Sequence, residues 1–306
     1  MRIAAVDLVS NTCFPALAAE ALGFYKAEGL DAHIELVPML GATKALRNGT
    51  ADAMIAGSVH DVLTEFPGWE GVKLVVALSQ GTPWLLVVRA DLAAKRGDLG
   101  AVKGLRLTAA EGPDLALRQM LIDANIDPDR DLRILELPGA KARDVSFGVF
   151  AARALEEGQI DGFWANAMGG ETAARRGVGK ILVDVRRGDD PADVRHFTFA
   201  GLATTEAQIE RDAESVGAAV RAIVKTQKAL REDPTLAAEV GRRKFPTEAA
   251  ELITTIVERD LPFYDPVIYE EAVAGLNRFA QSIGHLTGPA PYEQVVAVRF
   301  RDLWRS

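Results

Sequence analysis

The stretch from Ser10 to Leu30 constrains the fold of this chain most. It follows a short apolar run, Ile3–Val6, which predicts a β-strand. Pro15 suits the first turn of a helix, and Gly23 is placed to end that helix in the left-handed conformation that glycine adopts at little cost. The chain therefore passes from a strand into a helix through the polar loop Ser10–Thr12, as in a βα unit.

The loop Ser10–Thr12 is a candidate binding site. In an open α/β sheet, ligands bind outside the carboxyl ends of the strands, and helix N-termini there offer free backbone amides. An ordinary capped βα turn explains the same polar residues equally well.

Strand and helix signals alternate along much of the chain, which favours parallel sheets with crossover helices. A chain of 306 residues is long enough for two lobes. We expect residues 1–88 and 196–306 to form lobe one and residues 89–195 to form lobe two. The strand predicted over 85–88 would then be the last of lobe one before the crossing, and 196–200 would be the returning strand. From Glu206 onward the pattern is helical.

The residues around this first βα unit closely resemble the opening of a known family. The loop Ser10–Thr12, the segment Ala18–Leu30 and the strand at His33–Val37 are similar to ABC-transporter substrate-binding proteins of the nitrate, sulfonate, taurine and thiamine-pyrimidine (NMT1-like) type. The resemblance continues through Gly41–Ala53 and Gly57–Ser58. It implies the type II periplasmic-binding-protein fold, an α/β fold with a ligand cleft between two lobes and a C-terminal helical extension on lobe one.

Candidate ligand-binding residues follow the predicted strands of both lobes. They are Ser10, Asn11, Thr12, Ser58, His60, Thr82, Trp84, Glu111, Gly112, Asp114, Trp164 and Asn166. Trp84 and Trp164 would form an aromatic wall for a flat or apolar ligand, or would simply plug the hinge or the core of a lobe. His60 is either a hydrogen-bond partner of the ligand or a capping or packing residue. Either Ser58 or Asp61 would cap the helix expected from Val62.

The charge of the ligand stays open at this level. Helix N-termini favour an anion such as a carboxylate or sulfonate, but no arginine is clearly placed to pair with one. The resemblance widens the class to carboxylates, sulfonates, pyrimidines and aromatic acids. It implies a protein that captures such a ligand and delivers it to an ABC transporter permease.

The rival hypothesis is a cytosolic enzyme on the same fold, similar to a decarboxylase or a thiamine-pyrimidine synthase. The cysteine-rich motif of the synthase is missing, and the opening motif fits the transport proteins better than the decarboxylase. Cys13 and His60 are a conceivable nucleophile and base, although free cysteine is usually a small buried hydrophobe. No hydrolase, metal-site or phosphate-loop motif is present, so we expect no catalytic residue, metal or cofactor.

Composition narrows the class of partner. A net charge of −8 argues against a nucleic-acid surface, and a regulator of the LysR type would need an N-terminal helix-turn-helix where this sequence has a strand. No apolar run is long enough to cross a bilayer, so the protein would meet the membrane only through the transporter. The family resemblance implies a periplasmic location with the leader removed, whereas a chain native from Met1 would be cytoplasmic.

Overall fold

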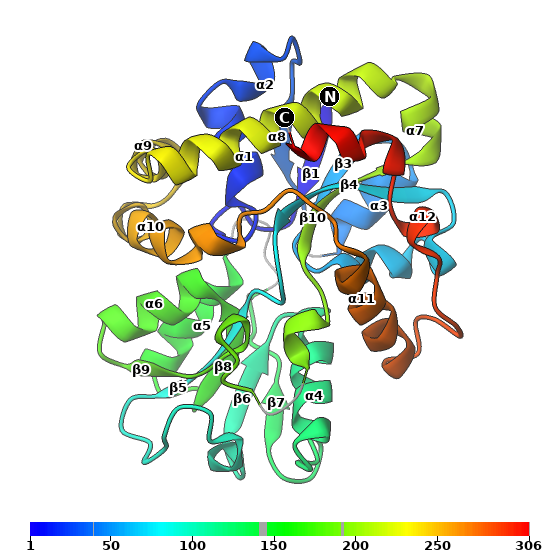
Figure 1. Ribbon diagram of the computed structural model, residues 1–306. Helices are drawn as coiled ribbons and strands as arrows, with labels where there is room; N and C mark the ends of the chain where they lie inside the picture. Colours follow the sequence, from blue (N-terminus) through cyan, green and yellow to red (C-terminus); the bar gives the residue numbers. More distant parts are fainter. Residues whose placement is uncertain (39, 141–145, 191–192, 306) are drawn as a thin grey trace.

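The computed structural model describes the chain from residue 1 to 305 with gaps at 39, 141–145 and 191–192, and it has the two lobes seen in Figure 1. Each lobe is built on a five-stranded sheet. The strands of the first sheet, in spatial order, are β2 (His33–Leu36), β1 (Arg2–Ala5), β3 (Ala53–Ala56), β10 (Ala200–Thr205) and β4 (Val72–Ser79). The strands of the second are β7 (Arg133–Leu135), β6 (Arg106–Ala109), β8 (Gly162–Asn166), β5 (Trp84–Arg89) and β9 (Gly179–Asp184).

Each sheet combines parallel strands with one antiparallel strand. In the first sheet β1 runs parallel to β2 and β3, while β10 runs antiparallel to β3 and β4. In the second sheet β6 runs parallel to β7 and β8, while β5 runs antiparallel to β8 and β9. Both N- and C-terminal segments lie in the first lobe, which is the upper one in Figure 1. The first sheet contains β1 from the start of the chain and β10, which follows every strand of the second sheet in the sequence, and we propose that the first lobe is assembled from both ends of the chain.

Helices cover both sheets. Around the first sheet lie α1 (Phe14–Ala21), α2 (Phe24–Ala27), α3 (Gly41–Arg47), α7 (Glu206–Arg211), α8 (Ala213–Glu232), α9 (Leu236–Lys244), α10 (Thr247–Asp260), α11 (Glu270–Ser282) and α12 (Tyr292–Val295). The second sheet carries α4 (Pro113–Asp123), α5 (Phe147–Glu156) and α6 (Ala167–Arg175). Short 3-10 helices are η1 (Val59–Thr64), η2 (Pro67–Trp69), η3 (Leu99–Val102), η4 (Val185–Arg187), η5 (Val194–His196), η6 (Leu261–Phe263) and η7 (Val298–Arg305). No described helix combines the length and the apolar character that a membrane crossing requires.

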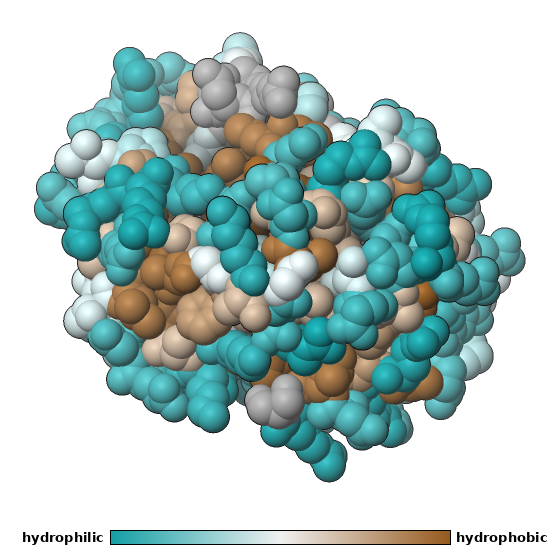
Figure 2. All heavy atoms as spheres, turned by 90° about the horizontal axis from the view of Figure 1, so that it is seen from above, coloured by the Kyte–Doolittle hydropathy of each residue, from teal (hydrophilic) through white to brown (hydrophobic). Residues whose placement is uncertain are grey.

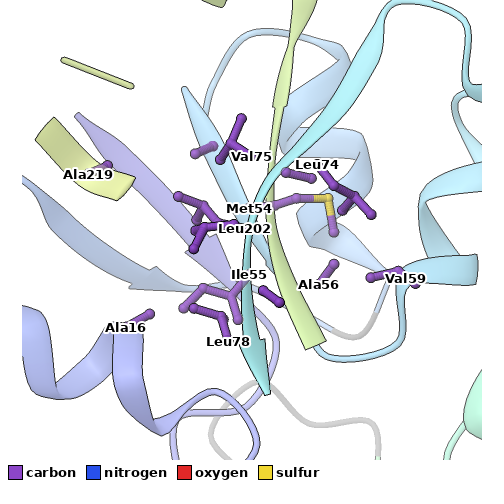
Figure 3. Close-up of a cluster of buried hydrophobic side chains, with 14 of the residues drawn as sticks. Ala16, Met54, Ile55, Ala56, Val59, Leu74, Val75, Leu78, Leu202 and Ala219 are labelled. Atoms are coloured by element: carbon purple, nitrogen blue, oxygen red, sulfur yellow. The ribbon is translucent and has the colours of Figure 1, made fainter. Parts of the chain in front are cut away.

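The core of the first lobe explains why its strands are apolar on both sides. Every residue of β3 is buried, because helices pack on both faces of the sheet. Figure 3 shows Met54, Ile55, Leu74 and Leu202 meeting from β3, β4 and β10. Burying one such side chain contributes about 1.5–3 kcal/mol, so this cluster fixes the edge of the sheet from which the binding loops leave.

The first βα unit is built as predicted. Pro15 lies in the first turn of α1, and Gly23 has a φ of 80° between α1 and α2. The polar loop before α1 therefore emerges at the carboxyl end of β1.

The strand over 85–88 belongs to the second sheet, not to lobe one as expected. Its counterpart β5 pairs with β8 and β9, so the chain crosses between the sheets at 80–83. The residues of β5 from Trp84 to Val88 are all buried, and a continuous apolar run fits the middle of either sheet. We therefore propose that the first lobe boundary lies at 80–83, rather than after residue 88.

Three further elements differ from the sequence-based expectation. The returning strand is β10, which starts at Ala200, while His196 ends the 3-10 helix η5. The helix expected from Val62 is the 3-10 helix η1, which starts at Val59. The sequence also predicts a helix from about residue 142 to 157; the described helix is α5, Phe147–Glu156, and 141–145 lie outside the described residues.

The C-terminal helices reach the second lobe as well as the first. Arg176, directly after α6, pairs with Glu248 of α10 at 2.6 Å, and α10 and α6 share one hydrophobic cluster with α1. Figure 2 views the molecule from the first-lobe end, where hydrophilic residues separate the hydrophobic areas. The buried apolar contacts lie inside the first lobe and also between the lobes, where one cluster joins α1 and α10 to α5 and α6.

Candidate functional site

A cavity lies where the binding-loop edges of the two sheets face each other. Its volume is about 110 Å³, counted as space open to the centre of a water molecule. The carboxyl ends of β1 and β3 meet those of β6 and β8 there, together with the start of β5. The lining residues are Val6, Asp7, Ser10, Thr12, Cys13, Leu40, Ala42, Thr43, Met54, Ile55, Ala56, Gly57, Ser58, Asp61, Pro83, Trp84, Ala110, Pro113, Phe147, Gly148, Trp164, Ala165 and Asn166. This is the position at which α/β sheets bind ligands.

Half of the predicted ligand-binding residues line this cavity. They are Ser10, Thr12, Ser58, Trp84, Trp164 and Asn166. Glu111 and Asp114 line a neighbouring cavity, which shares Ala110 and Phe147 with the first. The other four, Asn11, His60, Thr82 and Gly112, are buried and are not among the lining residues of the first cavity.

Asn11 points its polar groups into the protein interior. Its side-chain amide donates to Asp260, whose carboxylate also accepts from Arg186 at 3.2 Å. The hydroxyl of Tyr264 donates to the backbone carbonyl of Asn11 at 2.6 Å. This network ties the loop before α1 to the end of α10 and to η4, so Asn11 holds the binding loop in place.

Thr82 has an equivalent role at the crossing between the sheets. Its hydroxyl donates to the carbonyl oxygen of Val194 at 2.6 Å, and its backbone N–H donates to the carbonyl of Arg195 at 3.0 Å. These bonds join the two segments that connect the lobes.

His60 connects the lobes through one ring nitrogen and is held within its own lobe by the other. Nε2 lies 3.0 Å from the carbonyl oxygen of Gly112, and Nδ1 lies 2.7 Å from the hydroxyl of Ser58. Because a carbonyl only accepts, Nε2 carries the proton and Nδ1 accepts from Ser58. Burial lowers the pKa of His60 to about 4, so the ring is neutral. Ser58 therefore orients His60, instead of capping the following helix with its side chain as one alternative had it.

Asp7 is a lining residue that the sequence analysis missed. Its Oδ1 accepts from the backbone N–H of Val9 at 2.8 Å, and its Oδ2 accepts from the hydroxyl of Ser146, in the second lobe, at 3.1 Å. Burial raises the pKa of Asp7 to about 6, and hydrogen bonds from Val9, Ser146 and Asn166 oppose that rise. The available signal was its position immediately after the first strand.

Asp61 is the second carboxyl group on the cavity wall. Burial raises the pKa of Asp61 to about 8, and the charges of Asp114 and Glu111 add to the rise. It lies so close to Gly112 that a Cβ there would come within 2.5 Å of its Oδ1. Gly112 also has a φ of 92°, which a residue with a side chain rarely adopts. Glycine at this position therefore allows the two lobes to approach.

Cys13 lines the cavity as a protonated thiol. Burial and the nearby charge of Asp7 raise the pKa of Cys13 to about 12. The partners of the His60 ring nitrogens are Ser58, Gly112 and Asp61, so His60 does not act as a base on Cys13 in this arrangement.

Two tryptophans form one wall of the cavity. The ring centroids of Trp84 and Trp164 lie 5.9 Å apart with their planes at 52°. Within the described residues, the indole N–H of Trp164 and the hydroxyl of Thr12 are buried without a hydrogen-bond partner. A bound ligand would supply those partners.

The described residues bring together no group of three or more His, Cys, Asp or Glu side chains that could hold a metal ion. The cavity wall offers apolar and aromatic surface, a few hydroxyl and amide groups, and two carboxyl groups.

Two α/β lobes with a cavity between them are the defining features of type II periplasmic binding proteins. The NMT1/THI5-like family model matches residues 11–237, and the chain belongs to that family. This confirms the relationship expected from the first βα unit.

Solved structures with this fold include transport proteins and an enzyme. The putative sulfonate-binding protein SsuA of Methylobacillus flagellatus KT is 19% identical and has a TM-score of 0.68, with 99% of this chain and 93% of that chain covered. The nitrate-binding protein NrtA of Synechocystis PCC 6803 is 13% identical and has a TM-score of 0.71, with 99% and 86% covered. The desulfurization enzyme DszB is 14% identical and has a TM-score of 0.69, with 99% and 98% covered. A search among curated proteins finds no match to the sequence.

Proposed function

We propose that this protein captures a small organic ligand between its lobes and delivers it to an ABC transporter permease. The observation that carries the proposal is a cavity enclosed by contacts between the lobes. His60 reaches the carbonyl of Gly112, and Asp7 accepts from the hydroxyl of Ser146. Such contacts break and form when two lobes open and close around a hinge.

The side chains at the cavity favour ligand binding over catalysis. The thiol of Cys13 is protonated and is not among the partners of the His60 ring nitrogens, while His60 is neutral and engaged in structural hydrogen bonds. Neither group is therefore prepared for nucleophilic or acid–base catalysis. We propose a binding protein, not an enzyme, that acts in the periplasm beside its permease.

A thermal-shift screen with product analysis tests this function. A ligand that binds only the folded protein raises the melting temperature by mass action. The screen covers amines, carboxylates, sulfonates, pyrimidines and aromatic acids. Each stabilising compound is then recovered, and its molecular mass is determined by mass spectrometry. We expect it to be recovered unchanged. A compound that stabilises the protein and is then consumed would show that the fold carries an enzyme here, as it does in DszB.

A further inference from the structure

We propose that the cavity selects a small organic cation: an apolar body with a protonated amine, amidine or similar group. The inference rests on the proposed function and specifies the ligand class of the same cavity. The proposed ligand has the opposite charge to the sulfonate and nitrate named for two of the similar solved structures.

Two carboxyl groups from different parts of the first lobe line the cavity. Asp7 follows β1 and Asp61 lies in η1, and each keeps a carboxyl oxygen near the space between the lobes. Among the described lining residues there is no lysine, arginine or histidine. An anionic ligand would therefore meet two carboxyl groups, which become negatively charged when they ionise, and no cationic side chain from these residues, which is unfavourable in a site of low dielectric.

At three of the helix N-termini beside the cavity, acceptors of the protein already take one of the backbone amides. At α6, the Asn166 side chain accepts from the backbone N–H of Gly169 at 3.4 Å. At α4, Asp114 accepts from the N–H of Gly112 at 3.0 Å. At α1, the N–H of Ala16 bonds to the carbonyl of Cys13 at 3.1 Å. These three amides are thus engaged within the protein and are not open to an anion.

The rest of the wall suits the body of an organic cation. Trp84 and Trp164 offer aromatic rings, and a cation over an indole face gains about 0.5–2 kcal/mol. The buried, unpaired hydroxyl of Thr12 is an independent sign of a polar ligand, since its oxygen can accept from an ammonium group. A cavity of about 110 Å³ holds a group slightly smaller than benzene, which fills a cavity of roughly 150 Å³ in another protein.

A matched set of probes isolates the effect of charge. Cyclopentylamine, cyclopentanol and cyclopentanecarboxylate share one ring and differ in the polar group. Their affinities are measured by calorimetry at about pH 8.5 and constant ionic strength, where the carboxyl groups are largely ionised. We expect the affinity of the amine to be at least about tenfold higher than that of the other two, because one desolvated ion pair provides a difference of this size.

Isosteric variants assign that preference to the two carboxyl groups. Asp7→Asn and Asp61→Asn should each weaken cyclopentylamine binding by about tenfold and change cyclopentanol binding by less than about threefold. Asp123→Asn, an exposed position on α4, is the matched control and should change neither affinity.

The outcomes separate this inference from the proposed function. Tighter binding of the carboxylate, no preference, or no binding of the amine at about 50 mM would overturn the cation inference, because a ligand of this size reaches millimolar affinity in a fitting cavity. A receptor function would survive each of those results. Conversion of a bound probe into another compound would instead overturn the proposed function.

Discussion

The Nε2 nitrogen of His60 donates across the lobe interface to the carbonyl oxygen of Gly112, 3.0 Å away. His60 belongs to η1 of the first lobe, and Gly112 precedes α4 of the second. Beside this bond, Asp61 packs against the α-carbon side of Gly112. The closed arrangement of the cavity therefore depends on a small residue at position 112.

Replacing Gly112 by alanine should impair closure more than folding. The new Cβ would meet Asp61 Oδ1 at 2.5 Å, and the φ of 92° would add strain. We expect ligand affinity to fall at least about tenfold, because opening the lobes relieves the clash. Solution scattering should show a larger radius of gyration for the ligand-bound variant than for the ligand-bound wild type.

Gly104→Ala is the matched control for backbone strain. Gly104 has a φ of 80°, and a Cβ added there would have no neighbouring atom within 4 Å. Its substitution should cost a similar strain energy, about 1 kcal/mol, and leave affinity unchanged. Equal affinity losses in the two variants would show that the Asp61 contact has no part in closure.

The raised pKa of the half-buried Asp61 carboxyl group should make the free protein less stable as pH rises. Its pKa is about 8 in the folded chain, compared with an ordinary value of 3.8. The folded state therefore holds the proton more tightly than the unfolded state. The free energy of unfolding therefore falls as pH rises between these values and levels off above the higher one. Asp114, Glu111 and His60 face the same carboxyl group and contribute to the wild-type profile.

Comparison with Asp61→Asn isolates this carboxyl group. His60, with its pKa lowered from 6.5 to about 4, destabilises the fold only as pH falls below its ordinary value, which is the opposite direction. Between about pH 6.5 and 8 the wild type should lose about 1 kcal/mol or more relative to the variant in urea titrations. Parallel curves for the two proteins would contradict an ionisation at Asp61.

Much of the first lobe was predictable because its signals are local. Pro15 and Gly23 define where α1 starts and where the chain turns toward α2, and the apolar runs of β1 and β3 locate the edge from which polar loops emerge. The cavity residues Ser10, Ser58 and Asn166 follow from the same rule, since each lies at the carboxyl end of a strand.

The remaining assignments depend on which distant segments meet. The apolar run of β5 fits either sheet, so its pairing with β8 and β9 could not be read from alternation. Asn11 follows a strand like its neighbours, but its partner Asp260 lies at the end of a helix far along the chain. The role of Asp7 depends on its hydrogen bond from Ser146 of the other lobe, a contact between distant segments that the local sequence does not predict.

Removing the carboxylate of Asp260 should destabilise the whole protein. Asp260 is buried against Arg186 at 3.2 Å and also accepts from Asn11. Asp260→Ala would leave the buried guanidinium without this partner, at a cost of about 3–5 kcal/mol. Chemical denaturation measures the loss. Arg175→Ala, which breaks an exposed pair with Glu251, should cost less than about 1 kcal/mol, and equal losses would contradict a special role for the buried network.

Cys13 should react slowly with thiol reagents in the folded protein. It is 8% exposed, and its raised pKa of about 12 leaves little thiolate at neutral pH. Alkylation by iodoacetamide at about pH 8 should be at least about tenfold slower than in urea-unfolded protein. Cys13→Ala should retain ligand affinity within about threefold, whereas fast alkylation of the folded chain would indicate an activated thiol.

The most direct test of the receptor function is equilibrium dialysis of the compound that most raises the melting temperature, with mass spectrometry of both compartments over several hours. A binding protein should retain about one molecule per chain at saturation and release it chemically unchanged on denaturation. Steady accumulation of a compound of different mass, dependent on the folded protein, would contradict that account and identify an enzyme.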